Sequence, residues 1–328
     1  MKLSIAIIGA GLSGLTLAHK LQGKAETTIF EKSRGAGGRM STRYTDDYQF
    51  DHGAQFFTAR SKSFQQFLAP FRDSGIVQQW LPKVLTLGVG KKPYKRDWFE
   101  PHYVGAPKMN SLCNHLAKAH NVEFNVHVCE IKKQGSGWLL IDSDQNEYAP
   151  FDWVVSSVPA KQAAELFPVE FQEYSEINGV TMMGCYCLML GFSELPKFNW
   201  DAAKVNHSSI GWLSVDSSKP GRDYGACVVV HSTNEWAEKH IDEDQEYVSK
   251  ALMDELHKVA AIDATESQYQ SLHRWRYANT FYNEDDDDNA NMYLIDHNLN
   301  LAACGDWLIK GHVESAYLSA EALAKALG

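Results

Sequence analysis

The feature that most constrains the fold is an unbroken pattern over residues 3–31. A β-branched, apolar run at residues 3–8 enters the glycine-rich turn Gly9-Ala10-Gly11-Leu12-Ser13-Gly14. Apolar residues at helical spacing follow, and a second strand-like run at residues 27–30 ends at Glu31. This order is typical of a βαβ unit that binds a dinucleotide, and it predicts that residues 3–8 form a central, buried strand of a parallel sheet.

The residues of this turn have distinct expected roles. Gly9 permits the tight turn, Gly11 lets the backbone approach a pyrophosphate, and Gly14 lets the helix pack closely on the strand. Amide groups at the start of the helix offer partial positive charge to the phosphates. Glu31 lies 22 residues after Gly9, where its carboxylate can accept hydrogen bonds from ribose hydroxyls. The cofactor-binding residues expected here are Gly9, Gly11, Leu12, Ser13, Gly14 and Glu31.

Composition narrows the class of protein. The chain has 328 residues, which suggests two domains or one domain with a large insertion. Its 41 acidic residues outnumber its 31 lysines and arginines, so we expect neither nucleic acid nor an anionic membrane as a partner. The six cysteines include no CxxC pair, and the first apolar run is too short for a signal peptide or a membrane span. A reduced, cytoplasmic protein is therefore expected.

The rest of the chain predicts a second, inserted domain. Strand-like runs of mixed polarity at residues 184–192, 209–215 and 227–232, with one long helix at residues 244–259, indicate an α+β domain on an antiparallel sheet. Short strand-like runs within residues 76–100 suggest a small sheet on the same domain. The expected fold class is therefore α/β plus α+β.

The cofactor domain is expected to be discontinuous. A buried strand at residues 153–155 extends the parallel sheet, as does a strand at residues 299–304, which a helix at residues 314–327 follows. We therefore expect a Rossmann-like domain with a parallel sheet, interleaved with a substrate domain built on the antiparallel sheet. The cofactor domain comprises residues 1–60, 101–159 and 296–328, and the substrate domain comprises residues 61–100 and 160–295.

Several smaller features favour structural roles. Residues 61–71 are expected to form a helix with a phenylalanine-rich stripe in the core, and residues 122–131 alternate like one strand. Cys185 and Cys187 are expected to be small buried hydrophobic residues. The acidic run at residues 284–288 favours a solvated loop over a metal site, and we expect no metal.

Three segments resemble the amine-oxidase-like flavoproteins. Residues 31–39 add three glycines and an arginine after the second strand, residues 50–60 contain Gly53-Ala54, and Gly305-Asp306 follows the last strand. The resemblance implies that FAD binds without a covalent link, although Cys304 leaves such a link open. The alternative for residues 31–39 is a flexible basic loop.

The same resemblance assigns a part of FAD to each segment. It implies that the loop before Arg39 covers the pyrophosphate, that Gly53-Ala54 passes beside the isoalloxazine ring, and that Val128 lies against adenine. It also implies that Asp306 contacts the ribityl chain and that a helix beginning near Val313 points at the flavin pyrimidine. The cofactor-binding residues that the resemblance adds are Lys32, Gly38, Arg39, Ala54, Gln55, Phe56, Val128, Gly305, Asp306 and Val313.

Two narrower motifs resemble the bacterial renalase-like flavoproteins. They are Gly-Ala-Gln-Phe-Phe-Thr-Ala-Arg at residues 53–60 and Gly-Asp-Trp-x(3)-Gly-x-Val-Glu at residues 305–314. This resemblance implies an FAD-dependent oxidase that takes hydride from the 2- or 6-dihydro isomers of NAD(P)H at flavin N5. Molecular oxygen then accepts the electrons and forms hydrogen peroxide. The implied partners are a dihydronicotinamide dinucleotide and oxygen.

The substrate-contacting residues are less defined by the sequence. His52 is a catalytic candidate, but a histidine beside a glycine turn also suits a structural hydrogen bond. Arg274, Trp275, Arg276 and Tyr277 suit an anionic, aromatic substrate by ion pairing and stacking. The alternative is a strand of core aromatic residues and solvated arginines. Because strand residues alternate, Trp275 and Tyr277 are expected on one face and Arg274 and Arg276 on the other. Only one of these two pairs is therefore expected to face the flavin.

Two other classes of function stay open. A flavin-containing amine oxidase or desaturase of the same fold is the enzymatic alternative. An amine oxidase needs an aromatic cage flanking the flavin and commonly a lysine near flavin N5, and the sequence alone does not place Lys108 or Lys310 there. A flavin-binding sensor without turnover is the other alternative. A sensor usually carries a DNA-binding or signalling module, and the sequence shows no helix-turn-helix pattern or basic stretch.

Overall fold

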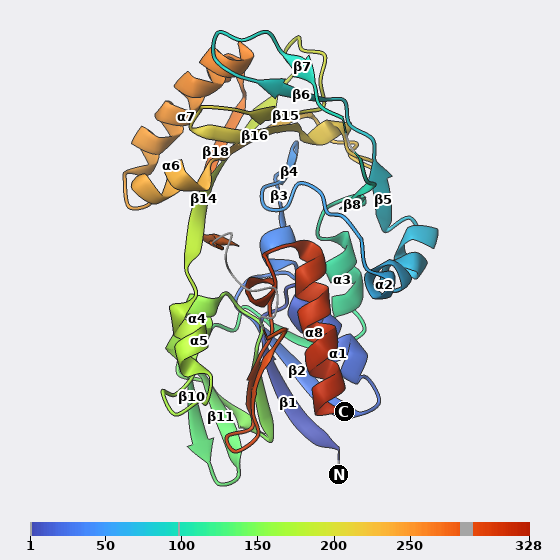
Figure 1. Cartoon of the computed structure of the whole chain (residues 1–328), viewed down its shortest axis with the longest axis vertical. Helices are drawn as coiled ribbons and strands as arrows, with labels where there is room; N and C mark the ends of the chain where they lie inside the picture. Colours follow the sequence, from blue (N-terminus) through green and yellow to red (C-terminus); the bar gives the residue numbers. More distant parts are fainter. Residues whose placement is uncertain (1, 98, 283–290) are drawn as a thin grey trace.

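The computed structural model describes residues 2–97, 99–282 and 291–328 of the chain. In Figure 1 a sheet that contains the N-terminal strand forms the lower part of the molecule, and a second large sheet arches above it. The predicted acidic loop at residues 284–288 lies outside the described residues. Among the described helices, none has the length and apolar character needed to cross a membrane.

The lower sheet confirms the predicted parallel arrangement. β1 lies between β13 and β2 and pairs in parallel with both, and the full order is β19-β20-β13-β1-β2-β9. β19 pairs antiparallel with β20, while the remaining neighbours run parallel. The strands are β1 (Leu3–Ile8), β2 (Ala25–Glu31), β9 (Asn121–Phe124), β13 (Trp153–Ser156), β19 (Leu294–Asp296) and β20 (Leu301–Ala303).

Helices α1 (Leu12–Leu21) and α8 (Val313–Leu327) lie side by side against this sheet (Figure 1). Lys20 on α1 forms a 2.8 Å ion pair with Glu321 on α8. α2 (Lys62–Asp73) begins after Ser61, whose hydroxyl caps the helix by accepting from the amide of Phe64. The predicted phenylalanine stripe of α2 packs into the same core as α1 and α8, and α3 (Ser111–Ala117) joins them.

The predicted single strand at residues 122–131 is wrong. Asn125 adopts φ +60°, a left-handed conformation that ends β9, and β10 then begins in a different sheet. That sheet is a three-stranded antiparallel meander. Its strands are β10 (Val128–Gln134), β11 (Gly137–Asp142) and β12 (Glu147–Phe151).

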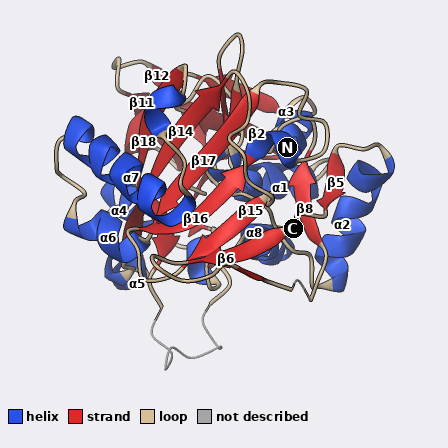
Figure 2. Cartoon of the chain, turned by 90° about the horizontal axis from the view of Figure 1, so that it is seen from above, coloured by secondary structure: helices blue, strands red, loops and turns tan. Residues whose placement is uncertain are grey.

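The upper sheet, which we call the substrate sheet, has seven strands in the order β18-β14-β17-β16-β15-β6-β7 (Figures 1 and 2). It is antiparallel, as predicted, apart from the parallel pair β15 and β6. Its strands are β6 (Val84–Leu87), β7 (Tyr94–Lys95), β14 (Met182–Phe192), β15 (Ala202–Val205), β16 (Ile210–Val215), β17 (Ala226–Ser232) and β18 (Tyr269–Thr280).

The small sheet predicted within residues 76–100 forms only in part: β6 and β7 pair with each other, but they belong to the larger substrate sheet. β6 pairs with β15 and so extends the substrate sheet across a long gap in sequence. β5 (Val77–Trp80) instead pairs with β8 (His102–Gly105), and β3 (Thr42–Tyr44) pairs with β4 (Gln49–Asp51). The spacing of the strand-like runs within residues 76–100 does not indicate which distant strands they pair with.

The two faces of the substrate sheet have different neighbours. Leu188 of β14 packs into a core with α7, whereas Cys187 and Met189 pack against Phe50 of β4 on the other face. The buried positions predicted for Cys185 and Cys187 are confirmed. The helices α6 (Asn234–Lys239) and α7 (Gln245–Ala260) pack on this sheet, whereas α4 (Ala160–Leu166) and α5 (Tyr174–Gly179) pack in a core with strands of the lower sheet. The inner face of the sheet therefore meets the segment that follows β3 and β4.

Candidate functional site

The glycine-rich turn between β1 and α1 has the geometry of a phosphate-binding turn. Gly9 adopts φ +107°, and a Cβ on Gly14 would collide with the carbonyl oxygen of Gly9. A Cβ on Gly11 would meet nothing within 4 Å. α1 begins at Leu12 without a side-chain cap, so its first amides can bind an anion. Packing requires glycine at positions 9 and 14, whereas the open space at Gly11 fits a bound pyrophosphate.

Glu31 joins this turn to the loop that follows β2. Its buried carboxylate accepts a 2.8 Å hydrogen bond from the amide of Ala10. The amide of Gly37 donates to the carbonyl of Ala10 across 2.9 Å, and Gly38 adopts φ +53°. The side chain of Lys32 is exposed. The glycines at residues 35–38 therefore lie against the first glycine-rich turn, and the carboxylate of Glu31 binds that turn from beside them.

Arg39 connects three segments that are far apart in sequence. Its guanidinium forms an ion pair with Asp306 and donates a 3.2 Å hydrogen bond to the carbonyl of Ala278. Its own carbonyl accepts a 2.9 Å hydrogen bond from the amide of Ala54. A Cβ on Gly53 would collide with that same carbonyl, so the turn after β4 can approach Arg39 only with glycine there.

The C-terminal motif packs against the N-terminal one. The amide of Gly305 donates a 2.8 Å hydrogen bond to the hydroxyl of Ser319, while α8 begins at Val313 without a side-chain cap. The hydroxyl of Ser13 on α1 donates to the sulfur of Cys304 across 3.2 Å. Burial raises the pKa of the Cys304 thiol to about 12, so this thiol is neutral near pH 7.

Val128 lies beside Glu31 at the start of β10. Its side chain is buried in a cluster with Phe30 and Leu140. Just before it, the amide of Val126 donates a 3.0 Å hydrogen bond to the carbonyl of Glu31. The segment expected to contact adenine therefore runs alongside the acid expected to bind ribose.

The turn after β4 enters the junction between the two large sheets. Gln55 is buried, and its amide nitrogen donates to the carbonyl of Asp51 while its oxygen accepts a 3.2 Å hydrogen bond from Lys219. Phe56 packs against aromatic rings that include Trp212 on the substrate sheet, at 5.7 Å between ring centroids. The side chains of Gln55 and Phe56 thus brace the turn and fix its backbone.

A buried network of four charged side chains lies beside this turn, and the sequence reading missed it. Lys219 forms ion pairs with Asp216 and, at 3.2 Å, with Asp51, and all three side chains are almost completely buried. Arg222 forms a second ion pair with Asp51 at 2.6 Å. The only sequence signal for this network is the segment 218–222, Ser-Lys-Pro-Gly-Arg, which lies between two strands. Its composition is typical of an exposed turn and so does not predict buried charges.

The network fixes the charge of Asp51. Burial alone would raise the pKa of this carboxyl, but the charges of Lys219 and Arg222 hold it well below its usual range. Burial and the neighbouring Asp51 carboxylate raise the pKa of Asp216 even though Lys219 opposes that shift. Asp51 is therefore an ionised carboxylate whose charge is balanced by Lys219 and Arg222.

His52, His231, His273 and Trp275 form a second group at the same junction, which we call the histidine–tryptophan cluster. The His273 ring lies 4.9 Å from the His52 ring and 4.4 Å from the Trp275 ring, measured between centroids. The indole nitrogen of Trp275 donates a 2.8 Å hydrogen bond to the carbonyl of His52, which also lies 3.0 Å from Nε2 of His231. β4, β17 and β18 thus bring together residues from three parts of the sequence.

Burial keeps the three imidazoles neutral. It lowers the pKa of His52 to about 3 and that of His231 to about 4. Burial, with a further contribution from the charge of Arg43, lowers the pKa of His273 to about 4. Nδ1 of His52 is buried and has no hydrogen-bond partner among the described residues, and the same holds for Nδ1 of His231. The cluster therefore offers neutral aromatic surface and two unused ring nitrogens.

The candidate residues of β18 divide between its two faces. Trp275 lies in the cluster with His52, while Arg274 donates a 2.6 Å hydrogen bond to the carbonyl of Ile241 and Arg276 forms a 2.8 Å ion pair with Asp242. Tyr277 packs in a different core, together with Trp307. Arg276 therefore points away from His52, because neighbouring strand residues face opposite sides.

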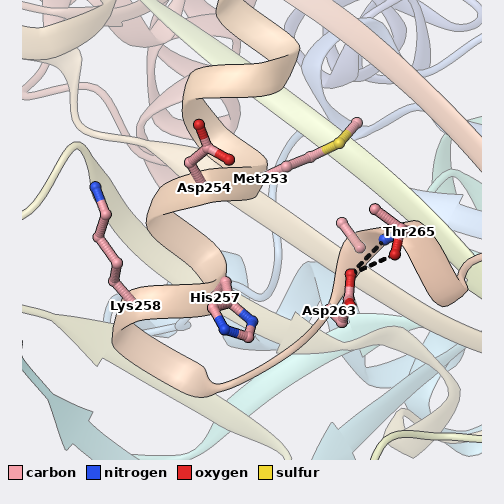
Figure 3. A pocket seen from close by; sticks show the side chains of 7 residues that line it. Met253, Asp254, His257, Lys258, Asp263 and Thr265 are labelled. Atoms are coloured by element: carbon pink, nitrogen blue, oxygen red, sulfur yellow. Dashed lines mark hydrogen bonds between the residues drawn. The ribbon is translucent and has the colours of Figure 1, made fainter.

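Figure 3 shows a pocket on the opposite side of the substrate sheet, where Met253, Asp254, His257, Lys258, Asp263 and Thr265 line it. Asp263 accepts hydrogen bonds from the amide and hydroxyl of Thr265, at 2.9 and 2.6 Å. Leu252 and Leu256 of α7 pack on the sheet face away from His52. This pocket is therefore separate from the site at the junction. The described residues contain no group of three or more side chains that could hold a metal ion.

Lys108 and Lys310, the two lysines considered for the amine-oxidase alternative, have different surroundings. The ammonium of Lys108 lies 4.3 Å from the centre of the Tyr44 ring, and Lys310 is exposed. Lys219 is the lysine that contacts Gln55, but it is already paired with two carboxylates.

The site residues fit FAD. The open space at Gly11 and the uncapped first turn of α1 suit a pyrophosphate, and Glu31 lies where a ribose would bind. The buried, unpaired Nδ1 of His52 lies next to the turn at Gly53 that would pass beside the isoalloxazine.

Comparisons with known proteins agree with this geometry. Residues 7–71 match the family described as NAD(P)-binding Rossmann-like domain, and residues 78–327 match the flavin containing amine oxidoreductase family. The 4,4'-diapophytoene desaturase of Staphylococcus aureus (strain Newman) is 35% identical over 77 residues, which cover 20% of this chain and 15% of the desaturase. The corresponding enzyme of Staphylococcus haemolyticus is 48% identical over 50 residues, which cover 15% and 10% of the two chains. This chain thus spans a small part of the desaturases that it matches.

Solved structures share the whole fold at low identity. A protein of Exiguobacterium sp. 255-15, provisionally described as a protoporphyrinogen oxidase, aligns with a TM-score of 0.79 and 11% identity over 100% of this chain and 99% of that one. A redesigned variant of putrescine oxidase aligns with a TM-score of 0.74 and 11% identity over the same shares. The family match covers most of the sequence, so the chain belongs to the flavin containing amine oxidoreductase family.

Proposed function

We propose that this enzyme oxidises 2- or 6-dihydro isomers of NAD(P)H to NAD(P)+ and transfers the electrons to molecular oxygen, which forms hydrogen peroxide. FAD, when bound, supplies the hydride acceptor at N5. The residues proposed to hold it are the two glycine clusters with Glu31, the turn at Gly53, the segment at Val128, the Arg39–Asp306 pair and the start of α8. We propose the domain division predicted from the sequence, with the addition that α2 packs with α1 and α8.

The observation that carries the proposal is the neutral, aromatic character of the histidine–tryptophan cluster. A dihydropyridine is an activated hydride donor because its ring nitrogen pushes electron density toward the departing hydride, so the reaction needs no strong base. His52, His231 and His273 have pKa values lowered to about 3 to 4, so they are neutral near pH 7. A planar nicotinamide can stack on the half-buried ring of Trp275. The contribution of the protein is orientation and exclusion of water.

The charges at the junction favour this substrate over an amine. The junction offers a cationic amine no free carboxylate at Asp51, which lies next to His52 and is already paired with Lys219 and Arg222. Asp216 is paired with the same lysine. A neutral dihydronicotinamide does not need such a partner.

The test is anaerobic mixing of the oxidised holoenzyme with three substrates, followed by flavin absorbance. The substrates are the borohydride-generated isomers of NADH, ordinary NADH, and putrescine as a representative amine. We expect the isomers to bleach the flavin rapidly and the other two to do so at least about 100-fold more slowly, a difference of about 2.7 kcal/mol in transition-state stabilisation. On readmission of air, one hydrogen peroxide should form for each isomer consumed.

Bleaching by putrescine and not by the isomers would replace the proposal with an amine oxidase. The matched variant is Trp275→Leu, which removes the aromatic surface from the cluster without adding charge. We expect it to slow bleaching by the isomers, with flavin content unchanged.

A further inference from the structure

Arg43 occupies an unusual position between the cofactor half of the molecule and the substrate sheet. It lies in the middle of β3, opposite Phe50 of β4, and its guanidinium donates a 3.1 Å hydrogen bond to the hydroxyl of Ser271 on β18. Its neighbours face the other way, because Thr42 bonds to Asp51 and Tyr44 lies against Lys108. Arg43 therefore points toward the inner face of the substrate sheet.

This position is at one end of the histidine–tryptophan cluster. Ser271, which Arg43 contacts, is two residues before His273 and therefore lies on the same face of β18. His273 in turn contacts both His52 and Trp275. The pKa of His52 is lowered first by burial, then by His273, and then by the charge of Arg43. The effect of Arg43 agrees with its position beside the cluster.

Among the described residues, Arg43 lacks the carboxylate partner that three other arginines around the junction have; Arg274 lacks one too, but it donates to the carbonyl of Ile241 and does not face the cluster. Arg39 pairs with Asp306, Arg222 with Asp51 and Arg276 with Asp242. In the part of the chain that the structure describes, Arg43 has no carboxylate within ion-pair distance, and its hydrogen bond to Ser271 goes to a neutral hydroxyl. A half-buried guanidinium without a counter-ion is unfavourable by itself and selects an anionic ligand.

We propose that Arg43 binds the pyrophosphate of the dinucleotide substrate, whose dihydronicotinamide ring lies against Trp275 and His273. This inference rests on the proposed function, since it names the residue that recognises the anionic part of that substrate. Arg43 thus takes the role that the sequence suggested for Arg274 and Arg276, which face the segment 241–242. A guanidinium suits this role because its planar donors match two phosphate oxygens at once.

The experiment compares two hydride donors on the holoenzyme. One is a dihydro isomer of NADH, and the other is the same isomer of 1-methyl-dihydronicotinamide, which carries the reactive ring without phosphates. Relative to wild type, Arg43→Gln should raise the KM for the dinucleotide by about tenfold or more, because one charge-assisted contact is lost. The KM for the phosphate-free donor should change by less than about twofold. Arg43→Lys should recover part of the loss for the dinucleotide.

The control is Arg276→Gln, which removes a charge from the opposite face of β18 and should leave both KM values unchanged. An equal loss with both donors in Arg43→Gln would overturn the proposal, because it would mean that Arg43 supports the structure of the site. Binding of the oxidised product NAD+ gives an independent readout, measured by isothermal titration calorimetry on the oxidised holoenzyme. If wild type oxidises neither donor, the proposed function fails. In that case, equal NAD+ affinity in wild type and Arg43→Gln would also reject the role of Arg43.

Discussion

The two halves of the site are built by different means. In the cofactor half, the backbone defines the site: Gly9, Gly14 and Gly53 lie where a side chain would be strained or would collide with a carbonyl oxygen. In the substrate half, side chains on or beside three strands define the proposed site, and the pairing of β14 with β17 and β18 brings two of these strands into one sheet. A backbone-built site leaves a local pattern of glycines in the sequence, whereas a side-chain-built site leaves none.

Charge shows the same contrast. The cofactor half can bind an anion with amides and helix ends, so the net charge of −10 is no obstacle. The substrate half concentrates charge in the buried network of Lys219, Asp51, Asp216 and Arg222 and keeps its imidazoles neutral. The following predictions test this contrast, beginning with the largest effect.

Substitution of the first-turn glycines should separate fold from ligand binding. Gly14→Val places a side chain against the carbonyl of Gly9, so we expect loss of folded, FAD-bound protein. Gly11→Ala meets no protein atom within 4 Å, so the fold should persist while FAD affinity falls. Circular dichroism and FAD titration of both variants provide the measurement. Equal behaviour of the two variants would contradict the assignment of Gly11 to the ligand.

Removal of the buried lysine should be costly. Lys219→Met leaves the buried Asp51 and Asp216 without their shared cation, so we expect the free energy of unfolding to fall by about 3 to 5 kcal/mol. The matched control is Lys239→Met, which breaks an exposed pair with Glu235 and should cost less than about 0.5 kcal/mol. Urea denaturation measures both. A loss below about 1 kcal/mol in Lys219→Met would contradict a closed network.

Acid should destabilise the protein through the histidine–tryptophan cluster. The folded-state pKa of His52 is lowered to about 3, so the unfolded chain binds a proton at higher pH than the folded one does. The stability from neutral His52 is full above about pH 6.5 and is lost as the pH falls, by about 2 kcal/mol between about pH 6.5 and about pH 5. Chemical denaturation of wild type and His52→Gln over this range measures the effect. An unchanged pH dependence in the variant would contradict a neutral, buried His52.

The Arg39–Asp306 pair should contribute modestly to FAD binding. Arg39→Met removes the ion pair that joins the turn at Ala54 to the C-terminal motif, so the Kd for FAD should rise about tenfold, or about 1.4 kcal/mol. Fluorescence titration of the apoprotein with FAD measures this change. A Kd equal to that of wild type would show that the pair is separate from the flavin.

The cofactor half was largely predictable from the sequence. Sequential βαβ spacing specified β1, α1 and β2, and separate motifs assigned Arg39 and Asp306 to the cofactor, whereas the ion pair between them was not predicted. In contrast, β6 was misplaced because its partner β15 is more than 100 residues away, and Asn125 divided a run that alternates like one strand. Lys219 was missed because a Lys-Pro-Gly segment reads as an exposed turn, and only the tertiary fold buries it. Short-range sequence patterns cannot predict that a side chain will be buried by segments far away in the sequence.

The central claim is that the site orients a hydride donor and supplies no titrating base. The most direct test is the rate constant for anaerobic flavin reduction by a saturating dihydro isomer of NADH, deuterated at the reacting carbon and undeuterated, over about pH 6 to about pH 9. We predict a primary isotope effect and a rate constant that does not change over this range, because the imidazoles of the cluster are neutral throughout. A rate constant that titrates near neutrality, or a flavin that the isomers do not reduce, would contradict the account.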